Sequence, residues 1–399
     1  MIWAVLVALF SSDSVHRLWG VMAACGYGLA LLAILAIRNA RVSDLALGVS
    51  FIGALLAPLA WMAAKGLEQP EVWVVARSGS MLIHQGTPYT SAAALAATTN
   101  PNAYNPYLPV MALFGLPRAL FDGGLLTDPR IWFGVVFLAV FWLALRQAGA
   151  RDPGRWTILV AGSPVIAFEL AVGGTDVPMV GFLCLGFALL YRRPTSVTFA
   201  VLAGLALGIA SAMKATAWPA LVVAVVLILV RDGRKAAGAF IVAALAVVAV
   251  CVGPFVVHPK SLVDNTIKFP LGLASVRSAA SSPLLGHVIA ATWHTAGDTI
   301  VVALLVLAAA VVALSLVFRP PRSVSRAVVL LAGAMTLMFV LAPSTRFGYF
   351  IYPATLAIWL FAVRAGGPLR AGPATPDPDG PAARLSTSRP TIPAERPAA

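Results

Sequence analysis

The chain has 399 residues, of which 60% are hydrophobic and only 11% are charged, and its formal net charge is +13. Soluble domains carry about 25% charged residues, so the composition excludes a typical soluble protein and predicts a polytopic membrane domain. The positive charge does not indicate a nucleic-acid partner, because much of it lies in short loops between apolar segments. The three cysteines lie inside apolar segments, which predicts neither disulfides nor a metal site.

The first apolar segment, at 1–12, is too short to cross a membrane and lacks the features of a signal peptide. We expect it to be an anchor in the membrane interface or the end of a helix that starts further upstream.

Eleven longer apolar segments follow, and most approach the ~20 residues that a helix needs to cross the hydrocarbon core. Two of them are short and need buried ends or a thinner bilayer. We therefore predict an all-α polytopic membrane helix bundle of about 11 transmembrane helices within residues 1–365. The tail at 366–399 is rich in proline and alanine, and we expect it to be disordered and cytoplasmic. The predicted spans are 18–37, 44–64, 131–146, 156–172, 177–191, 197–213, 216–230, 236–257, 299–318, 326–342 and 347–364.

Basic residues set the predicted orientation. Five short loops, at every second position between the spans, hold 13 lysines and arginines, whereas the alternate loops are longer and sparser in basic residues. This asymmetry places the short basic loops in the cytoplasm. The long loops 65–130 and 258–298 are then expected on the extracytoplasmic face of a multi-pass protein of the cell membrane.

Two carboxylates, Glu68 and Glu71, follow the span that ends near Ala64. At the depth of the lipid headgroups, a base can meet a lipid-borne reactive group from one side and a water-soluble hydroxyl from the other. Either residue is therefore a candidate general base. The alternative is an ordinary solvated acid in a loop.

Tyrosines and prolines dominate the segment from Asn100 to Pro109, which predicts a rigid, extended or turning loop. Tyr104 and Tyr107 are candidates for stacking on a sugar, or for an aromatic belt at the membrane interface. The apolar segment from Val110 to Phe121 is predicted to be a helix lying in the interface.

Further ionisable residues lie at the same predicted face. Glu169 and Asp176 flank a double glycine, and acids at membrane depth usually face a cavity or a partner. Asp176 could instead cap the next helix together with Thr175. Lys214 and Arg346 are candidates for gripping a phosphate, and a snorkelling role is the alternative for Lys214.

These residues resemble the pattern of glycosyltransferase family 87, whose members use polyprenyl phosphate sugars and have the GT-C membrane fold. The pattern runs in order through residues 65–365. An acid at Glu71 precedes Trp73, and a Gly-x-Pro-Tyr motif ends at Tyr89. The matching residues are Glu71, Trp73, Gly86-Thr87-Pro88-Tyr89, Tyr104-Asn105-Pro106, Gly173-Gly174-Thr175-Asp176, and Lys214 with Pro219. The family's first acid is usually aspartate, which leaves Glu71 and Glu68 as alternatives here.

The resemblance implies a hexosyltransferase. We expect no cofactor and identify no metal-ligating residues, and metal dependence stays open. Its donor would be a polyprenyl phosphate sugar, with mannose expected, and its acceptor a glycolipid or glycan. Glu71, Glu68 or Asp176 would be the catalytic acid or base, acting by an inverting mechanism. Lys214 and Arg346 would bind the donor phosphate. Tyr89, Tyr104 and Tyr107 would bind the sugar or the acceptor.

Two other classes remain open. A transporter or flippase of a lipid-linked sugar would place its charges near the bilayer midplane and show related halves, whereas the candidates here gather at one face. A structural membrane subunit would need no outer face lined with acids and bases. The gathering of charged residues at one face and the acids and bases in the outer loops both favour an enzyme over these two classes.

Overall fold

The computed structural model describes residues 1–37, 41–191, 195–293 and 296–365. The predicted disordered tail at 366–399 lies outside this described part. Within it, the regular elements are helices, and the one extended pairing is an isolated bridge between Ser281 and Thr345. The predicted all-α class is therefore confirmed.

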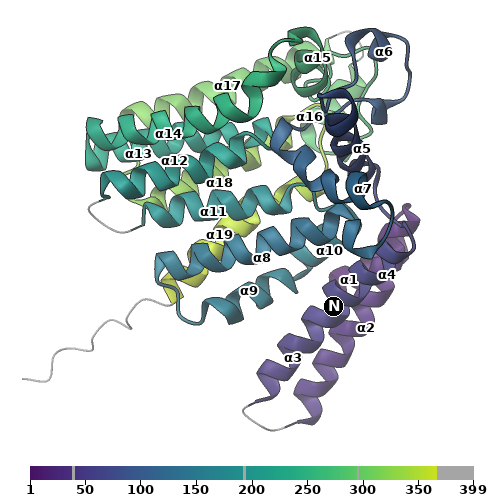
Figure 1. Ribbon diagram of the computed structural model, residues 1–399. Coiled ribbons are helices and arrows are strands. Elements are labelled where there is room, and N and C mark those ends of the chain that lie inside the picture. Colours follow the sequence, from purple (N-terminus) through teal and green to yellow (C-terminus); the bar gives the residue numbers. More distant parts are fainter. Residues whose placement is uncertain (38–40, 192–194, 294–295, 366–399) are drawn as a thin grey trace, which may run out of the picture.

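The N-terminal helices form an arm on one side of the molecule (Figure 1). The segment predicted as an anchor is α1 (Ile2–Phe10), which packs against α2 (Ser14–Ala36). The next span comprises α3 (Val42–Phe51), a π-helical turn at Ile52–Leu56 and α4 (Ala57–Ala64). A Cβ built on Gly26 would lie 2.7 Å from the Cα atom of Gly53. Small residues thus let α2 approach the π-helical turn closely, as is common between membrane helices.

The remaining long helices form the main bundle (Figure 1). Within it, α11 packs along α8 and α12, and α12 packs along α14. The bundle consists of α8 (Pro129–Ala148), α11 (Val177–Leu189), α12 (Val197–Ser211), α13 (Trp218–Asp232), α14 (Arg234–Val252), α17 (Gly297–Phe318), α18 (Val324–Leu341) and α19 (Ile351–Ala365).

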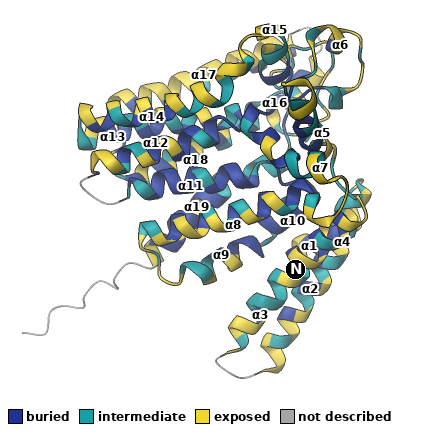
Figure 2. Ribbon diagram, viewed as in Figure 1, coloured by how far each residue is buried: buried dark blue, intermediate teal, exposed yellow. Residues whose placement is uncertain are grey.

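Burial follows the expectation for a bundle in lipid. The central helix α11 is almost entirely buried, whereas α17 exposes most of its apolar surface (Figure 2). Large apolar side chains such as Val250 and Phe318 are fully on the outside. Only a hydrocarbon environment satisfies such a surface without an energetic cost.

The predicted number of eleven spans is not confirmed. Among the described residues, eight helices are long and apolar enough to cross a membrane. The predicted span 156–172 is broken into α9 (Pro153–Ala161) and α10 (Pro164–Val172), which are bent by 60°. Pro164 lacks an N–H group and disfavours helical backbone before it, which explains the break. The helices α11 and α12 have only 13 and 15 residues.

Short helices from distant parts of the sequence gather at one end of the main bundle, which we call the loop face (Figure 1). The expected single helix from Val110 to Phe121 is instead a 3₁₀ segment (Pro109–Gly115) followed by α7. The loop-face α-helices are α5 (Pro70–Gln85), α6 (Ala92–Ala96), α7 (Leu116–Phe121), α15 (Pro259–Val263) and α16 (Leu285–Thr292). The other short turns are Pro101–Ala103, Leu125–Thr127, Ala215–Ala217, Gly253–Phe255, Asp264–Lys268 and Phe347–Phe350.

Backbone contact between two glycines fixes α5 against the 3₁₀ segment. A Cβ on Gly115 would collide with the carbonyl oxygen of Val75, and a Cβ on Gly79 would collide with the backbone of Gly115. Because backbone atoms form both contacts, neither side can move aside cheaply. This contact sets the position of α5, which carries Glu71.

We predict that Gly115→Ala lowers the thermal unfolding midpoint of the detergent-solubilised protein, because overpacking of this kind costs about 1–3 kcal/mol. Gly123→Ala is the matched control, since nothing lies within 4 Å of a Cβ at that position. Equal midpoints for the two variants would contradict the close packing of α5.

Candidate functional site

Two acid–base pairs lie at the loop face. The guanidinium of Arg346 donates from Nη1 to Oε1 of Glu71 over 2.6 Å. The ammonium of Lys214 donates to both carboxylate oxygens of Asp176, over 2.8 and 3.1 Å. All four residues were singled out from the sequence, and the structure joins them into two pairs. We call these four residues the ion-pair cluster.

Glu71 is placed by the start of α5. Pro70 occupies the first turn of this helix, where its missing N–H costs nothing. Just before it, the backbone N–H of Gln69 donates to the carbonyl oxygen of Val172 over 2.9 Å, which ties α5 to the end of α10. A Cβ on Gly173 would lie 2.8 Å from Oε1 of Gln69 and 3.1 Å from Oε1 of Glu71. The glycine therefore leaves the room that the Glu71 carboxylate occupies.

Arg346 is placed by a paired stretch of extended backbone. The N–H of Thr345 donates to the carbonyl oxygen of Ala280 over 3.1 Å, and the N–H of Ser282 donates to the carbonyl oxygen of Thr345 over 2.9 Å. The buried hydroxyl of Thr345 donates to the carbonyl oxygen of Phe339. The loop after α15 thus holds the segment that carries Arg346.

Asp176 does not cap α11 with its side chain. It occupies the N-cap position, but its carboxylate accepts no backbone hydrogen bond there and instead receives the bonds from Lys214. The capping alternative is therefore wrong. Lys214 lies beyond the end of α12, in extended backbone, and the adjacent carbonyl oxygen of Met213 accepts a bond from the N–H of Leu108 over 2.8 Å.

Tyr107 connects the first loop to the ion-pair cluster. Its hydroxyl donates to Oγ1 of Thr175 over 3.1 Å, next to Asp176 in the sequence. The Lys214 ammonium lies 5.5 Å from the centre of the Tyr107 ring and 4.8 Å from that of Tyr349. Both distances are within the range of a cation–π attraction. Tyr89 supports this arrangement, because its hydroxyl donates to the carbonyl oxygen of Tyr107.

Both cations of the cluster stay charged. Burial alone would lower the pKa of Lys214, but the Asp176 carboxylate raises it well above its ordinary value. Burial opposes the charge of Arg346 in the same way, and Glu71 raises the pKa of that guanidinium. The site therefore offers two permanent positive charges, each held by a carboxylate.

Glu68 belongs to a different network. Its carboxylate accepts a hydrogen bond from Arg118 over 3.1 Å and lies 3.7 Å from Arg130. Burial raises the pKa of Glu68, and the charge of Arg118 opposes this. The fully buried Arg130 also binds Asp128 and donates to the carbonyl oxygens of Leu67 and Ala171. This network fixes the start of α8 to the loop before α5.

Tyr104 packs away from the ion-pair cluster. Its ring stacks on Phe269, with centroids 4.4 Å apart and an angle of 7° between the planes. The stacking covers one face of the Tyr104 ring with Phe269, and the residue as a whole is buried. Of the three predicted aromatic residues, only Tyr107 approaches the charged groups.

Glu169 was considered from the sequence but not chosen, and the structure places it beside the ion-pair cluster. All four cluster residues act on its carboxyl group electrostatically. The signal in the sequence was an acid inside an apolar segment. Two further cluster neighbours, Gln69 and Tyr349, were missed, because polar or aromatic residues in loops carry no such signal. Thr175 was named only as a possible capping partner of Asp176 and as part of the family motif.

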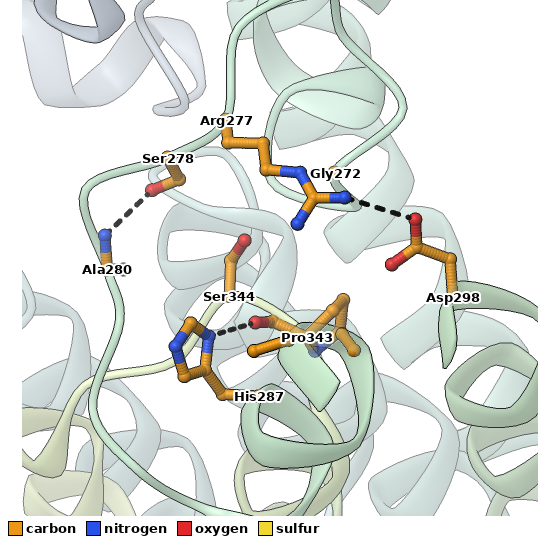
Figure 3. Close-up of a pocket in the computed structure, with 10 residues that line it drawn as sticks. Gly272, Arg277, Ser278, Ala280, His287, Asp298, Pro343 and Ser344 are labelled. Carbon is orange, nitrogen blue, oxygen red and sulfur yellow. Dashed lines mark hydrogen bonds and ion pairs between the residues drawn. The ribbon is translucent and has the colours of Figure 1, made fainter. Parts of the chain in front are cut away.

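Two cavities lie near the loop face. One holds about 50 Å³ between the loop after α15, α16 and Pro343, where Arg277 reaches toward Asp298 at 3.6 Å and His287 contacts Pro343 (Figure 3). The other is an apolar groove of about 360 Å³ whose lining includes Met213, the neighbour of Lys214. It is lined by Val110, Leu113, Phe114, Pro117, Trp132, Val136, Phe182, Ile209 and Met213.

The sequence comparison identifies the family. Residues 105–343 match the model of glycosyltransferase family 87, which is more than half of the chain. The chain belongs to glycosyltransferase family 87. The resemblance inferred from the motifs is thus confirmed. No curated protein sequence matches it.

Solved structures support the same fold. The chain is similar to ArnT from Cupriavidus metallidurans bound to undecaprenyl phosphate, with a TM-score of 0.50 and 17% identity, over 82% of this chain and 60% of ArnT. Against the apo state of ArnT, the TM-score is 0.48 and the identity 18%, over 81% of this chain and 60% of ArnT. The family-87 chain thus has the GT-C fold and spans 60% of the length of ArnT.

The family match and the ion-pair cluster overlap only in part. Asp176 and Lys214 lie within the matched residues, whereas Glu71 and Arg346 lie on either side of them. The pair of Asp176 and Lys214 is therefore contained in the family region. In the other pair, Glu71 precedes this region in the sequence and Arg346 follows it.

We predict that Arg130→Met destabilises the protein by about 3–5 kcal/mol, because it removes the buried cation of Asp128 and leaves only the partly exposed Arg118, at 3.3 Å. Arg155→Met is the matched control, since its pair with Asp44 is exposed and such pairs contribute about 0–1 kcal/mol. Thermal unfolding in detergent measures both. A similar loss for the two variants would show that the buried network does not hold α8 in place.

Proposed function

We propose that this family-87 glycosyltransferase moves a hexose, with mannose as the first candidate, from a polyprenyl phosphate sugar to a hydroxyl of a glycolipid or glycan. The supporting observation is the ion-pair cluster, which combines the buried Lys214 and the half-buried Arg346 with two carboxylates at one end of a membrane bundle. The cations suit a phosphate, and a carboxylate suits a general base. Mannose is expected from the family resemblance alone.

The donor phosphate would bind between Lys214 and Arg346. Each cation is held by a carboxylate, and a phosphate oxygen can replace that carboxylate as the hydrogen-bond acceptor. Charge-assisted hydrogen bonds of this kind are about twice as strong as neutral ones. The two cations would then stabilise the negative charge that develops on the leaving polyprenyl phosphate.

The prenyl chain of the donor would occupy the apolar groove. Met213, the neighbour of Lys214 in the sequence, lines this groove, so a chain lying in it could bring its phosphate beside Lys214. Its lining is aliphatic and aromatic, which suits a hydrocarbon chain. The solved ArnT structure with undecaprenyl phosphate provides a donor-type lipid on the same fold.

Glu71 would act as the base. Its Oε2 atom is buried and has no hydrogen-bond partner among the described residues, while Oε1 is held by Arg346. When the phosphate takes Arg346, the carboxylate becomes free to accept a proton. The acceptor oxygen would then attack the anomeric carbon, its proton would pass to Glu71, and the bond from that carbon to the phosphate oxygen would break. Attack opposite to the leaving group inverts the anomeric centre.

The other residues would position these groups. Asp176 keeps Lys214 charged and directed, and Tyr107 lies against both the lysine and Thr175. The distribution of basic residues supports an extracytoplasmic location for the loop face. Gathering of the charged groups at one end of the bundle, rather than at its middle, favours a transferase over a transporter.

Transfer activity tests the proposal. Membranes containing the protein would receive radiolabelled polyprenyl phosphate mannose, arabinose or glucose, and label would be followed into glycolipid or glycan. We expect Glu71→Gln to lower the transfer rate by about 10²–10⁴-fold, the usual contribution of a general base. Glu68→Gln should retain most activity per folded protein. The opposite result would make Glu68 the base, and no transfer from any donor by the wild type would refute the proposed function.

Binding of the phosphate gives an independent prediction. We expect Lys214→Met to weaken the binding of undecaprenyl phosphate to the purified protein by at least about 10-fold, since a charge-assisted bond contributes about 1.5–3 kcal/mol. Lys260→Met, on α15, is the control for a change of net charge at the loop face. Equal affinities of the two variants would remove Lys214 from the phosphate site.

A further inference from the structure

Glu169 is the third carboxyl group at the site. It lies in the last turn of α10, directly before the turn that carries Asp176. Glu71, Asp176, Arg346 and Lys214 all act on it electrostatically, with Glu71 strongest among them. Its carboxyl group also lies against the backbone at Gly348, two residues after Arg346, so it is a neighbour of the ion-pair cluster.

The three carboxyl groups differ in how they are bonded. Both oxygens of Asp176 bind Lys214, and one oxygen of Glu71 binds Arg346. Among the described residues, no hydrogen bond or ion pair reaches the side chain of Glu169, which is only half-buried. A carboxyl group at membrane depth is costly to leave without a partner, which points to a partner that arrives with the substrate.

Gly348 holds Glu169 in this position. A Cβ on Gly348 would overlap Oε1 of Glu169 and come within 3.0 Å of Oε2. The carboxyl group therefore lies directly against the backbone two residues after Arg346. Any larger residue at 348 would push the carboxyl group away, because it is the flexible partner in this contact.

We propose that Glu169 binds a hydroxyl group of the sugar that is transferred and thereby contributes to the choice of donor sugar. This inference rests on the proposed function. With the phosphate between Lys214 and Arg346 and the acceptor at Glu71, the sugar ring would lie between these groups, within reach of a carboxyl group held beside Gly348. Sugar hydroxyls are hydrogen-bond donors, and a carboxyl oxygen is the matching acceptor.

The acidic side chain of Glu169 separates this role from a role in phosphate binding. A carboxyl group repels a phosphate when it is ionised and holds no positive charge when it is protonated, so its removal should leave phosphate binding unchanged or make it tighter. Removal of a bond to a sugar hydroxyl should instead weaken the binding of the sugar-bearing donor alone. The two roles therefore predict opposite effects on two ligands that differ only by the sugar.

The test compares two ligands on purified protein in detergent, without an acceptor. One is undecaprenyl phosphate, and the other is the undecaprenyl phosphate sugar that binds best among mannose, arabinose and glucose. The ratio of their dissociation constants measures what the sugar contributes. We expect Glu169→Ala to reduce this ratio by about 10-fold and to leave undecaprenyl phosphate binding at least as tight as in the wild type.

Gly348→Ala provides a second variant in which the carboxyl group of Glu169 is kept and only its position changes. It should reduce the same ratio, whereas Gly333→Ala on α18, where a Cβ meets nothing within 4 Å, should not. Glu169→Gln keeps one acceptor oxygen, so the ratio of the two dissociation constants should fall less than in Glu169→Ala. An unchanged ratio in Glu169→Ala, or an equal loss for both ligands, overturns the inference but not the proposed function. If the wild type binds neither ligand, the proposed function fails as well.

Discussion

The ion pair between Glu71 and Arg346 joins segments that are 275 residues apart in the sequence. A half-buried charge at the end of a membrane bundle is costly without a counter-charge, so the start of α5 and the loop before α19 must meet. Contacts around the ion pair hold these two segments in place. Gly79 and Gly115 set α5 against the 3₁₀ segment, and the pairing of Thr345 with the 280–282 backbone sets the position of Arg346.

Each of the two ion pairs in the cluster combines one cation with one carboxylate, so each pair has no net charge. Under the proposed function, a phosphate would replace a carboxylate at a cation that its ion pair already holds in place. An exchange of partners would also couple the arrival of the donor to the release of Glu71. Glu169 stands outside this exchange because neither cation is bonded to it.

Particular residues show how far sequence reasoning reached. The all-α membrane class, the family, and the four charged residues of the cluster could be inferred because apolar length, charge asymmetry and motif order are local properties. Glu68 and Glu71 are three positions apart and could not be separated, since the difference lies in Arg118 and Arg130, which belong to other elements. Tyr104 and Tyr107 are equally close in the sequence, yet one stacks on Phe269 and the other faces Lys214.

The sequence by itself determined the kind of molecule, because hydrophobic length and the cost of charge in lipid act on each segment separately. It also determined which residues could carry chemistry, since ionisable groups in an apolar chain are few. Only the tertiary structure decided how they are paired, where the predicted span 156–172 breaks, and that Glu169 is the carboxyl group left without a partner among the described residues. Pairing depends on contacts between distant segments, and no local pattern encodes them.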